Sequence, residues 1–349
     1  MDDEIRVPDE NRVAVGLSGG VDSAVAASVL LSEGFFVVGV YLSSEGLGPA
    51  ARDDAEATAK HLGIPFHVVD IEEELKRYVE APFVASYLRG ETPNPCIRCN
   101  RDVKFPALLR AADQFGCRYA ATGHYARTER RGAYTALLRG HPENDQSYML
   151  SWLSPAMLNR VLFPLGGMEK AEVRRRARTL ALPPADKPDS MEICFIPDND
   201  HAAFIEKAAG PLPEGDFVDE DGNVLGRHHG IVRYTVGMRR GLGIPSDRRL
   251  FVKRIDTETN RVVLGPVESL FTDTVRLRDV VRLSREVTDN PFPADVRVRH
   301  SKRSDRAEAL LSDTTGILRF VTPIRAPAAG QTAALYRGDE LLASGVIDI

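Results

Sequence analysis

Apolar and polar positions follow two different periodicities along the first 125 residues of the chain. Short apolar runs predict strands at residues 13–17, 36–42, 66–70 and 119–122. Between them, helical spacing of the apolar positions predicts helices at residues 21–31, 50–62, 72–88 and 100–115. Strands separated by such helices form βαβ units, which build a parallel sheet with helices on both faces. The expected fold class of this part is therefore α/β, with a doubly wound parallel sheet.

The pattern changes after about residue 205, where Gly, Pro, Val and Arg dominate the sequence. Short alternating runs at residues 261–264, 296–299 and 332–336 predict antiparallel strands, as in small β-barrels. One boundary is expected near Gly210–Pro213, and a second near residues 270–275. We therefore expect three domains: an α/β domain at 1–208, a small β-rich central domain at 209–272, and a C-terminal β-barrel at 273–349.

The composition is that of a folded protein in an intracellular compartment. Of the 349 residues, 43% are hydrophobic and 27% are charged, which argues against a disordered chain. No apolar run approaches the roughly 18 residues of a membrane span, and the acidic N-terminus does not resemble a signal peptide. Four cysteines are too few for a disulfide scaffold. These features predict a cytoplasmic protein without a membrane partner.

The net charge of −5 does not by itself indicate a nucleic-acid-binding protein. Local basic clusters do occur, one at residues 174–178 and another at residues 297–306. Each cluster alone is best interpreted as a solvated surface, although binding of nucleic acid needs only one basic face.

A glycine-rich loop after the first predicted strand carries the strongest chemical signal. Its residues are Gly16, Leu17, Ser18, Gly19, Gly20, Val21, Asp22 and Ser23. Glycines let the backbone approach phosphate oxygens, and the amides at the start of the following helix attract negative charge. The two serines add donors, while Asp22 is expected to hold Mg²⁺ or to order the loop. The spacing is neither the Walker pattern nor the dinucleotide-binding pattern.

This string resembles the loop of the PP-loop ATP pyrophosphatases. The resemblance implies that ATP is cleaved between its α and β phosphates and that a substrate carbonyl oxygen is adenylated. It also implies that residues 16–23 grip the pyrophosphate, and that Leu42 and Gly123 border the adenine and ribose. Both residues end predicted strands, in agreement with ligand binding at the carboxyl edge of a parallel sheet.

Several further motifs lie in register along nearly the whole chain. They are Thr92–Asn100, Ala121–Tyr125, Asp145–Tyr148, Asp189–Pro197 and Thr235–Ile244. Together they resemble the bacterial tRNA-specific 2-thiouridylases. The resemblance implies thiolation of C2 of the wobble uridine in tRNA, with ATP as cofactor. It also implies a partner protein that supplies sulfur, either a sulfur carrier or a relay from a cysteine desulfurase.

Two cysteines are implied by this resemblance to transfer the sulfur. Cys194 would carry it as a persulfide, and Cys99 would be the nucleophile that attacks this persulfide, releasing sulfide or closing a Cys99–Cys194 disulfide. Cys99 precedes a predicted helix, and a helix N-terminus lowers the pKa of a thiol. We therefore expect a lowered pKa for Cys99, because nucleophilic strength at neutral pH depends on thiolate.

Cys96 departs from the family pattern, in which an aspartate stands three residues before the first catalytic cysteine. Cys96, Cys99 and Cys194 could instead ligate a 4Fe-4S cluster that holds sulfide directly, so this alternative stays open. A zinc site would need a fourth ligand, and the remaining cysteine, Cys117, is expected to be a packed structural residue.

The resemblance also implies a set of tRNA-binding residues. They are His124, Asp145, Gln146, Ser147, Arg299, His300, Ser301 and Gln331. The oxygens of Asp145 suit base edges better than phosphates, and Gln331 is expected to contact the extruded base. Arg239 and Arg240 are expected to meet the tRNA backbone. The rival interpretations are another PP-loop ligase and a non-catalytic tRNA-binding protein.

Overall fold

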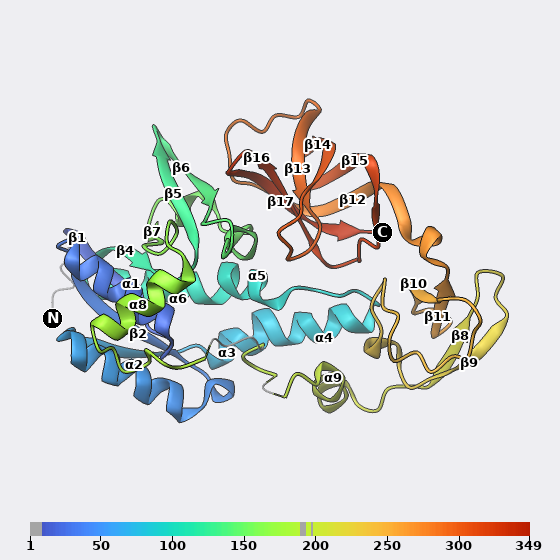
Figure 1. Ribbon diagram of the computed structural model, residues 1–349, viewed down its shortest axis with the longest axis horizontal. Coiled ribbons are helices and arrows are strands. Elements are labelled where there is room, and N and C mark those ends of the chain that lie inside the picture. The colour runs from blue at the N-terminus through green and yellow to red at the C-terminus, as the bar shows by residue number, and fades with distance from the viewer. Residues whose placement is uncertain (1–8, 189–192, 197) are drawn as a thin grey trace.

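The computed structural model describes residues 9–188, 193–196 and 198–349. Part of the motif Asp189–Pro197, namely residues 189–192 and 197, therefore lies outside the described residues. Figure 1 shows an α/β domain at one end of the molecule, a β-rich domain at the other end, and a barrel above the helices that join them. None of the helices that the structure describes is long and apolar enough to span a membrane.

The N-terminal domain contains a parallel sheet with strand order β3-β2-β1-β4-β7, so the predicted α/β class is confirmed. Its strands are β1 Asp9–Gly16, β2 Phe36–Ser43, β3 Phe66–Asp70, β4 Cys117–Ala121 and the short β7 Val161–Leu162. Its helices α1 Val21–Ser32 and α2 Gly48–Leu62 cover one face, and α6 Phe105–Gln114 covers the other. Helix α8 Lys170–Thr179 packs on the outer side of α1.

Two long helices of this domain contain a π-helical turn each. The first consists of α3 Glu72–Leu75, the π turn Lys76–Glu80 and α4 Ala81–Leu88. The second consists of α5 Pro95–Cys99, the π turn Asn100–Lys104 and α6. Pro82 and Pro106 lie just after these turns, where the missing proline N–H removes an α-helical hydrogen bond. The helix that was predicted to begin at Asn100 thus begins at Pro95, and both Cys96 and Cys99 lie on it.

A hairpin and several short helices complete this part of the chain. They are β5 Ala126–Arg131, β6 Tyr134–Arg139, α7 Pro155–Leu158, α9 His201–Ala209 and the 3-10 turns Glu45–Leu47 and Ser147–Leu150. The expected domain boundary at residue 208 falls just inside α9.

The central domain is a four-stranded sheet of order β10-β11-β8-β9. Its strands are β8 Gly215–Val218, β9 Val224–His228, β10 Phe251–Asp256 and β11 Arg261–Gly265, with 3-10 turns at Ile231–Arg233 and Val267–Leu270. Strands β8 and β11 are parallel, so the expectation of purely antiparallel strands is wrong at this pair.

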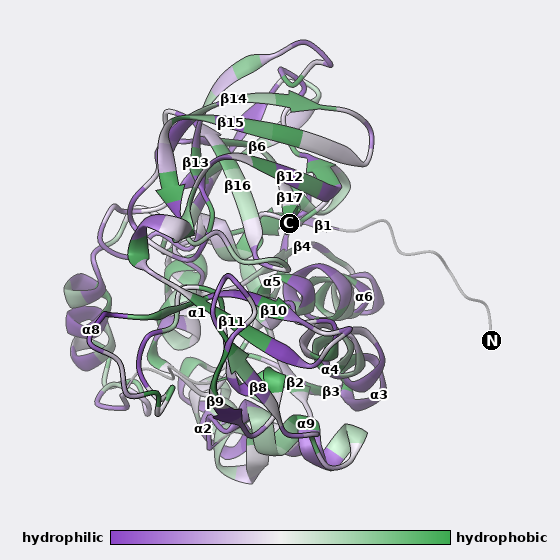
Figure 2. Cartoon of the chain, turned by 90° about the vertical axis from the view of Figure 1, so that its right-hand side faces the viewer, coloured by the Kyte–Doolittle hydropathy of each residue, from purple (hydrophilic) through white to green (hydrophobic). Residues whose placement is uncertain are grey.

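The C-terminal domain is a six-stranded barrel, closed by pairing of its first and last strands, as predicted. Its strands are β12 Phe271–Arg282, β13 Phe292–Arg297, β14 Asp305–Leu311, β15 Thr315–Arg325, β16 Thr332–Arg337 and β17 Glu340–Asp348. Buried and exposed residues alternate along β14 and along the first half of β15, because one side of each strand faces the barrel interior. The two strands lie side by side in Figure 2. The expected boundary at residue 272 falls just inside β12.

The barrel is joined to the N-terminal domain through a shared apolar core. Strand β6 pairs with β17 at Glu340, so the β5–β6 hairpin extends the barrel sheet. Tyr148 and Trp152 of the N-terminal domain pack in one cluster with Tyr336 and Leu341 of the barrel.

A buried ion pair lies at the same interface. The Arg297 Nη1 group donates to Asp145 Oδ2 at 2.6 Å. The Arg297 side chain is only 6% exposed and the Asp145 side chain only 4%. The other oxygen of Asp145 accepts from the backbone N–H groups of Gly140 and Ser147 at 2.9 and 3.0 Å. Both carboxylate oxygens of Asp145 are therefore bound within the protein.

Replacing Arg297 by Met would leave the Asp145 carboxylate buried without its cation. We expect the free energy of unfolding to fall by about 3 kcal/mol. Urea unfolding followed by the fluorescence of Trp152, the single tryptophan of the sequence, measures this change. The matched double variant Asp145→Asn/Arg297→Met removes both charges and should recover part of the loss. A single variant as stable as the unchanged chain would contradict a stabilising role for the pair.

Candidate active site

The phosphate loop connects the end of β1 to the start of α1, at the carboxyl edge of the parallel sheet. The Ser23 hydroxyl accepts from the N–H of Ser18 at 3.1 Å and donates to the Gly20 carbonyl at 3.0 Å. Gly19 has φ +74°, and an added Cβ would lie 2.3 Å from the carbonyl oxygen of Ala51 on α2. The loop is therefore tightly closed, and only glycine fits at position 19.

The two residues expected beside the adenine and ribose lie at the ends of the two strands that flank β1. Leu42 is half-buried near the end of β2, and Gly123 follows β4. An added Cβ on Gly123 would lie 2.7 Å from the backbone carbon of Asp22. The chain after β4 thus packs directly against the phosphate loop, which leaves no room for a side chain there.

Two lysines that sequence reasoning missed lie at this loop. Lys170 Nζ donates to both carboxylate oxygens of Asp22 at 2.7 Å, and the Tyr125 hydroxyl donates to one of them at 2.7 Å. Lys187 Nζ contacts Asp54 at 2.5 Å and the Gly19 carbonyl oxygen at 3.4 Å. These contacts favour the loop-ordering role of Asp22, and they place two ammonium groups beside the glycine-rich loop.

The two cysteines expected to transfer sulfur lie near one hydrophobic cluster. Cys99 and Ile193 pack against this cluster, which contains Val103 from the Cys99 helix and Phe195 from the turn after Cys194. An added Cβ on Gly46 would lie 2.8 Å from the Cys194 carbonyl oxygen, so the 3-10 turn Glu45–Leu47 packs closely against this turn. The fold therefore brings together two cysteines that are far apart in the sequence.

The expected low pKa of Cys99 is wrong in this structure. Desolvation by burial raises the pKa of the Cys99 thiol. The residue lies at the end of α5 and not before its N-terminus, so the expected helix effect is missing. The Cys194 side chain is exposed, but desolvation by the surrounding protein raises the pKa of its thiol to about 11, and the neighbouring Cys99 adds to this effect. The nearby ammonium group of Lys104 lowers the pKa of both thiols, which makes Lys104 a third functional candidate that sequence reasoning missed.

The remaining two cysteines differ in their surroundings. Cys96 is exposed at the start of α5, and its N–H donates to the Asn94 side chain at 3.1 Å. Cys117 is buried beneath α6, which agrees with a packed structural residue. Among the described residues all four cysteines are free thiols.

A metal cluster on the cysteines was left open above. Within the described part of the chain, no three His, Cys, Asp or Glu side chains form a group that could hold a metal ion. A 4Fe-4S cluster on Cys96, Cys99 and Cys194 therefore has no support from this arrangement and stays a prediction.

The segment Asp145–Ser147 serves the domain interface in this structure. Asp145 is bound as described above, and the fully buried Ser147 hydroxyl lies 3.0 Å from the Tyr336 hydroxyl. The Gln146 side-chain oxygen accepts from the Tyr125 N–H at 3.0 Å. The expected direct contact of Asp145 and Ser147 with tRNA does not agree with this burial, whereas contact by Gln146 stays a prediction.

His124 is packed rather than solvent-facing. Its Nδ1 lies 2.7 Å from the Thr122 hydroxyl, and its ring lies near Phe105 and Phe163. Burial, with a smaller effect of Lys104, lowers the pKa of His124 to about 3. His124 is therefore neutral at physiological pH, and any contact with tRNA would use an uncharged ring.

The expected tRNA-binding turn of the barrel faces solvent. Arg299 and His300 are exposed, and Arg299 Nη2 donates to the Arg325 carbonyl at 2.7 Å. The His300 ring stacks on Tyr148 at 5.9 Å, and the Ser301 hydroxyl donates to the Arg303 carbonyl. These side chains are accessible to RNA, and their contact with it stays a prediction.

The turn at Thr92 connects Gln331 to the cysteine helix. The Gln331 side-chain amide donates to the Thr92 carbonyl at 2.5 Å, and the Thr92 N–H donates to the Ala329 carbonyl at 2.8 Å. The Thr92 hydroxyl donates to that of Thr235 in the central domain at 3.3 Å. The residues just before α5 are thus held by both β-rich domains.

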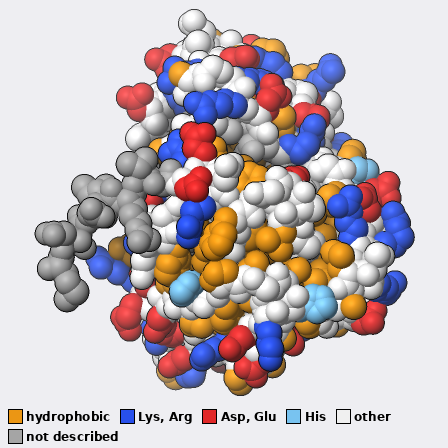
Figure 3. Space-filling model, turned by 90° about the vertical axis from the view of Figure 1, so that its left-hand side faces the viewer, with side chains coloured by type: hydrophobic (Ala, Val, Ile, Leu, Met, Phe, Trp, Pro, Cys, Tyr) orange, Lys and Arg blue, Asp and Glu red, His pale blue; other side chains and the backbone are white. Residues whose placement is uncertain are grey.

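Figure 3 shows hydrophobic side chains gathered on the face of the N-terminal domain opposite the central domain. A groove of about 650 Å³ between α1 and α8 is lined by residues that include Val29, Leu31, Leu62 and Leu180. These residues lie toward the C-terminal ends of α1, α2 and α8, away from the phosphate loop at the start of α1. The groove is therefore separate from the nucleotide site.

Comparison with protein families matches all three domains. Residues 11–198 match a tRNA methyl transferase HUP domain, residues 202–266 a tRNA methyl transferase PRC-barrel domain, and residues 272–347 an aminomethyltransferase β-barrel domain. The first match alone covers more than half of the chain.

Among solved structures, a 4-thiouridine synthetase–RNA complex with bound ATP matches 56% of this chain and 49% of its own, with 20% identity and a TM-score of 0.39. An NMN synthetase from Francisella tularensis matches 58% of this chain and 78% of its own, with 19% identity and a TM-score of 0.36. Likeness at this level does not bear on function.

Relatives along the full length are more informative. A tRNA-specific 2-thiouridylase of Geobacter metallireducens is 43% identical over 97% of this chain and 96% of its own length. One from Acidithiobacillus ferrooxidans is 42% identical over 97% of this chain and 98% of its own. One from Clostridium acetobutylicum is 38% identical over 96% of this chain and 99% of its own length. All three relatives are named as tRNA-specific 2-thiouridylases, although two of the matched family models are named after tRNA methyl transferase. The chain belongs to the family of the tRNA-specific 2-thiouridylases.

Proposed function

We propose that this chain uses ATP to replace the C2 oxygen of the wobble uridine in tRNA by sulfur. One observation carries the proposal: a pyrophosphate-type loop and a pair of cysteines, Cys99 and Cys194, lie on the same α/β domain. The loop can help to activate an oxygen as a leaving group, and the cysteine pair can deliver sulfur. Membership in the 2-thiouridylase family supports this combination.

In the activation step, the uridine O2 attacks the α-phosphorus of ATP, and pyrophosphate leaves. The amides of the loop Gly16–Ser23 would hold the leaving pyrophosphate, since they begin a helix and attract negative charge. Lys187 would exchange its contact with Asp54 for a phosphate oxygen, which stabilises charge that develops in the transition state. Mg²⁺ is expected to bind mainly through the phosphates, because Asp22 is already bound by Lys170.

In the sulfur-transfer step, the terminal sulfur of a Cys194 persulfide attacks C2, and AMP leaves with the former O2. The Cys99 thiolate then attacks the Cys194 sulfur. This step breaks the sulfur–sulfur bond, leaves sulfur on C2, and closes a Cys99–Cys194 disulfide. Lys104 would favour the anionic forms of these groups, because it lowers the pKa of both thiols.

Two partners complete the cycle besides tRNA. A persulfide-bearing carrier protein or desulfurase relay must load Cys194, which is exposed. The Cys194 thiolate would attack the terminal sulfur of the donor persulfide, and the donor cysteine would leave as a thiolate. A thiol reductant must then return the disulfide to two thiols. We place these exchanges in the cytoplasm, where reducing thiols are available.

Replacing the cysteines one at a time separates the mechanisms. We expect Cys99→Ser and Cys194→Ser to lose thiolation while they retain tRNA binding. Cys96→Ser should retain thiolation, because the persulfide route does not use Cys96. Mass analysis of tRNA, in which thiolation adds about 16 mass units per uridine, gives the readout. Loss of thiolation in all three variants would favour a cluster, and thiolation in Cys99→Ser and Cys194→Ser would refute the assignment.

Lys187→Gln should lower kcat/KM for ATP by about tenfold to hundredfold, which corresponds to one charged hydrogen bond to phosphate. Release of pyrophosphate at saturating tRNA measures this change. Lys60→Gln, on the exposed part of α2, is the matched control and should have no effect. An unchanged kcat/KM in Lys187→Gln would exclude Lys187 from the phosphate site.

A further inference from the structure

A third cysteine lies on the same helix as the expected nucleophile. Cys96 and Cys99 both belong to α5 and stand three residues apart, in the pattern Cys-x-x-Cys. Residues three apart in an α-helix are neighbours on one face. The rise and radius of a helix place their Cα atoms about 5 Å apart, which lies within the range of about 4.4–6.8 Å found in disulfides. The two thiols can therefore be joined with little movement of the backbone.

The rest of α5 is anchored in the protein. Ile97 is 1% exposed and packs in the cluster that the N-terminal domain shares with the barrel. Asn100, which directly follows α5, donates from its side-chain amide to the Met149 carbonyl at 2.8 Å. The face that carries the two cysteines is therefore fixed in position, with Cys96 exposed and Cys99 half-buried.

The third thiol of the site, Cys194, lies within range of both. Desolvation is the main cause of its raised pKa, and the charges of Cys99 and Cys96 add to the effect. Desolvation likewise raises the pKa of Cys99, and the charge of Cys96 adds to it. The three thiols are thus close enough to interact with one another.

Lys104 provides a cation for this group of sulfurs. It follows Cys99 across the π turn, whose hydrogen bonds join residues five apart. Although desolvation raises the pKa of all three thiols, the ammonium group of Lys104 lowers each of these pKa values. A thiolate that leaves in an exchange between these sulfurs is therefore stabilised.

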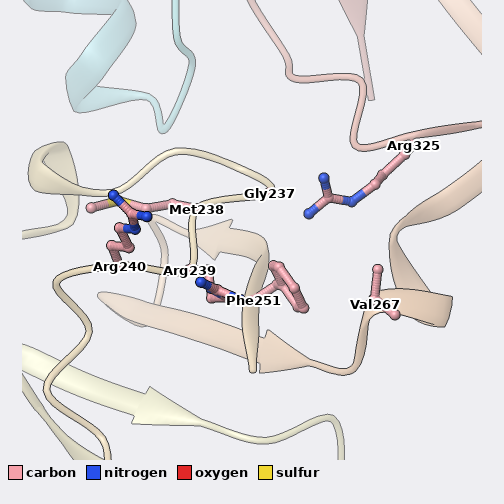
Figure 4. Close-up of a pocket in the computed structure, with 7 residues that line it drawn as sticks. All are labelled: Gly237, Met238, Arg239, Arg240, Phe251, Val267 and Arg325. Carbon is pink, nitrogen blue, oxygen red and sulfur yellow. The ribbon is translucent and has the colours of Figure 1, made fainter. Parts of the chain in front are cut away.

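The disulfide left by sulfur transfer joins Cys99 and Cys194 while the product uridine still lies beside them. Gln331, which is expected to contact the extruded base, donates to the turn just before α5. Arg239 and Arg240, which are expected to meet the tRNA backbone, are exposed at a pocket beside the barrel (Figure 4). RNA held by these residues hinders an external reductant, whereas a thiol on α5 itself needs no access from outside.

We propose that Cys96 is the resolving thiol of the sulfur-transfer cycle, and that its thiolate attacks Cys99 Sγ of the Cys99–Cys194 disulfide. The Cys99–Cys194 bond breaks, a Cys96–Cys99 bond forms, and Cys194 leaves as a thiolate. The exchange needs no oxidant, and the proton lost by Cys96 is balanced by one that Cys194 can take up. The proposal rests on the proposed function, which supplies the first disulfide.

A protein dithiol then restores the three thiols. One thiolate of this partner attacks the exposed Cys96 sulfur, and Cys99 leaves as a thiolate. The second thiolate of the partner attacks the partner's own sulfur in the mixed disulfide and releases Cys96. The partner ends as a disulfide, and Cys194 is already free to be loaded again.

This role accounts for cysteine at position 96, where the family pattern has an aspartate. A carboxylate cannot form a disulfide, so an aspartate leaves the Cys99–Cys194 bond to the external reductant alone. The chemical steps of the first turnover do not involve Cys96.

The test maps the disulfide that one turnover leaves. The full chain, carrying a persulfide on Cys194, is mixed with tRNA and ATP without reductant, quenched with acid, alkylated and digested. Mass spectrometry of the unchanged chain should find a Cys96–Cys99 disulfide together with thiolated uridine. Cys96→Ser should form the same amount of thiolated uridine and retain the Cys99–Cys194 disulfide.

Steady-state turnover gives a second readout. With limiting thioredoxin as the reductant, Cys96→Ser should turn over about tenfold more slowly, because attack by a thiol on the same helix is intramolecular whereas attack by the reductant depends on its concentration. Excess dithiothreitol should restore the rate, since this small dithiol reaches the Cys99–Cys194 disulfide directly. The matched control Cys117→Ala removes a thiol that is buried beneath α6, and it should change neither the disulfide nor the rate. Its Tm checks that it folds.

The possible outcomes separate this inference from the proposed function. Thiolated uridine with Cys99–Cys194 as the only disulfide of the unchanged chain would overturn the inference and leave the proposed function intact. Equal turnover of Cys96→Ser and the unchanged chain with limiting thioredoxin would do the same. Thiolation that requires reconstituted iron would also overturn it, because thiolates bound to a cluster are not free to exchange. Absence of thiolated uridine from the unchanged chain would refute the proposed function and, with it, this inference.

Discussion

The arrangement of this protein depends on the way the turn at Thr92 is held. The backbone of Thr92 is bound on the barrel side by Ala329 and Gln331, and its hydroxyl donates to Thr235 of the central domain. An ion pair between Glu91 and Arg278 at 2.8 Å reinforces the contact with the barrel. Helix α5, which carries Cys96 and Cys99, begins only three residues later. The position of the cysteine helix therefore depends on contacts with both the barrel and the central domain.

The interface between the domains contains several buried polar contacts in addition to its apolar core. Asp145 is bound to Arg297, and Ser147 contacts Tyr336. The Ser344 hydroxyl donates to the Ser151 carbonyl at 2.6 Å. Such contacts fix the relative orientation of the domains as well as stabilising their interface, because each hydrogen bond forms in only one packing of the domains. The segment Asp145–Ser147, which the family resemblance associates with tRNA, thus stabilises the domain interface in this structure. It also positions the exposed residues beside it.

Much of the fold could be predicted from the sequence, because apolar periodicity reports local structure directly. The parallel sheet, the phosphate loop and the closed barrel follow from it. The pairing of β6 with β17 could not be predicted, since it joins distant segments without a local signal. The same limit applies to the site. The glycines of residues 16–20 were evident, but Lys170 and Lys187 become part of the site only through tertiary contacts. The pKa of Cys99 was misjudged because its sequence neighbours indicate a helix start, whereas burial by residues far along the chain raises the pKa.

The central claim is that ATP activates the oxygen that sulfur later displaces. It predicts that the C2 oxygen of the uridine leaves the tRNA as part of AMP. Transfer RNA labelled with ¹⁸O at the C2 position of the wobble uridine, incubated with the chain, ATP and a persulfide donor, tests this directly by mass analysis of the nucleotide product. The account predicts AMP heavier by about 2 mass units, in equal amount to the thiolated uridine formed. Thiolated tRNA accompanied by unlabelled AMP would contradict it.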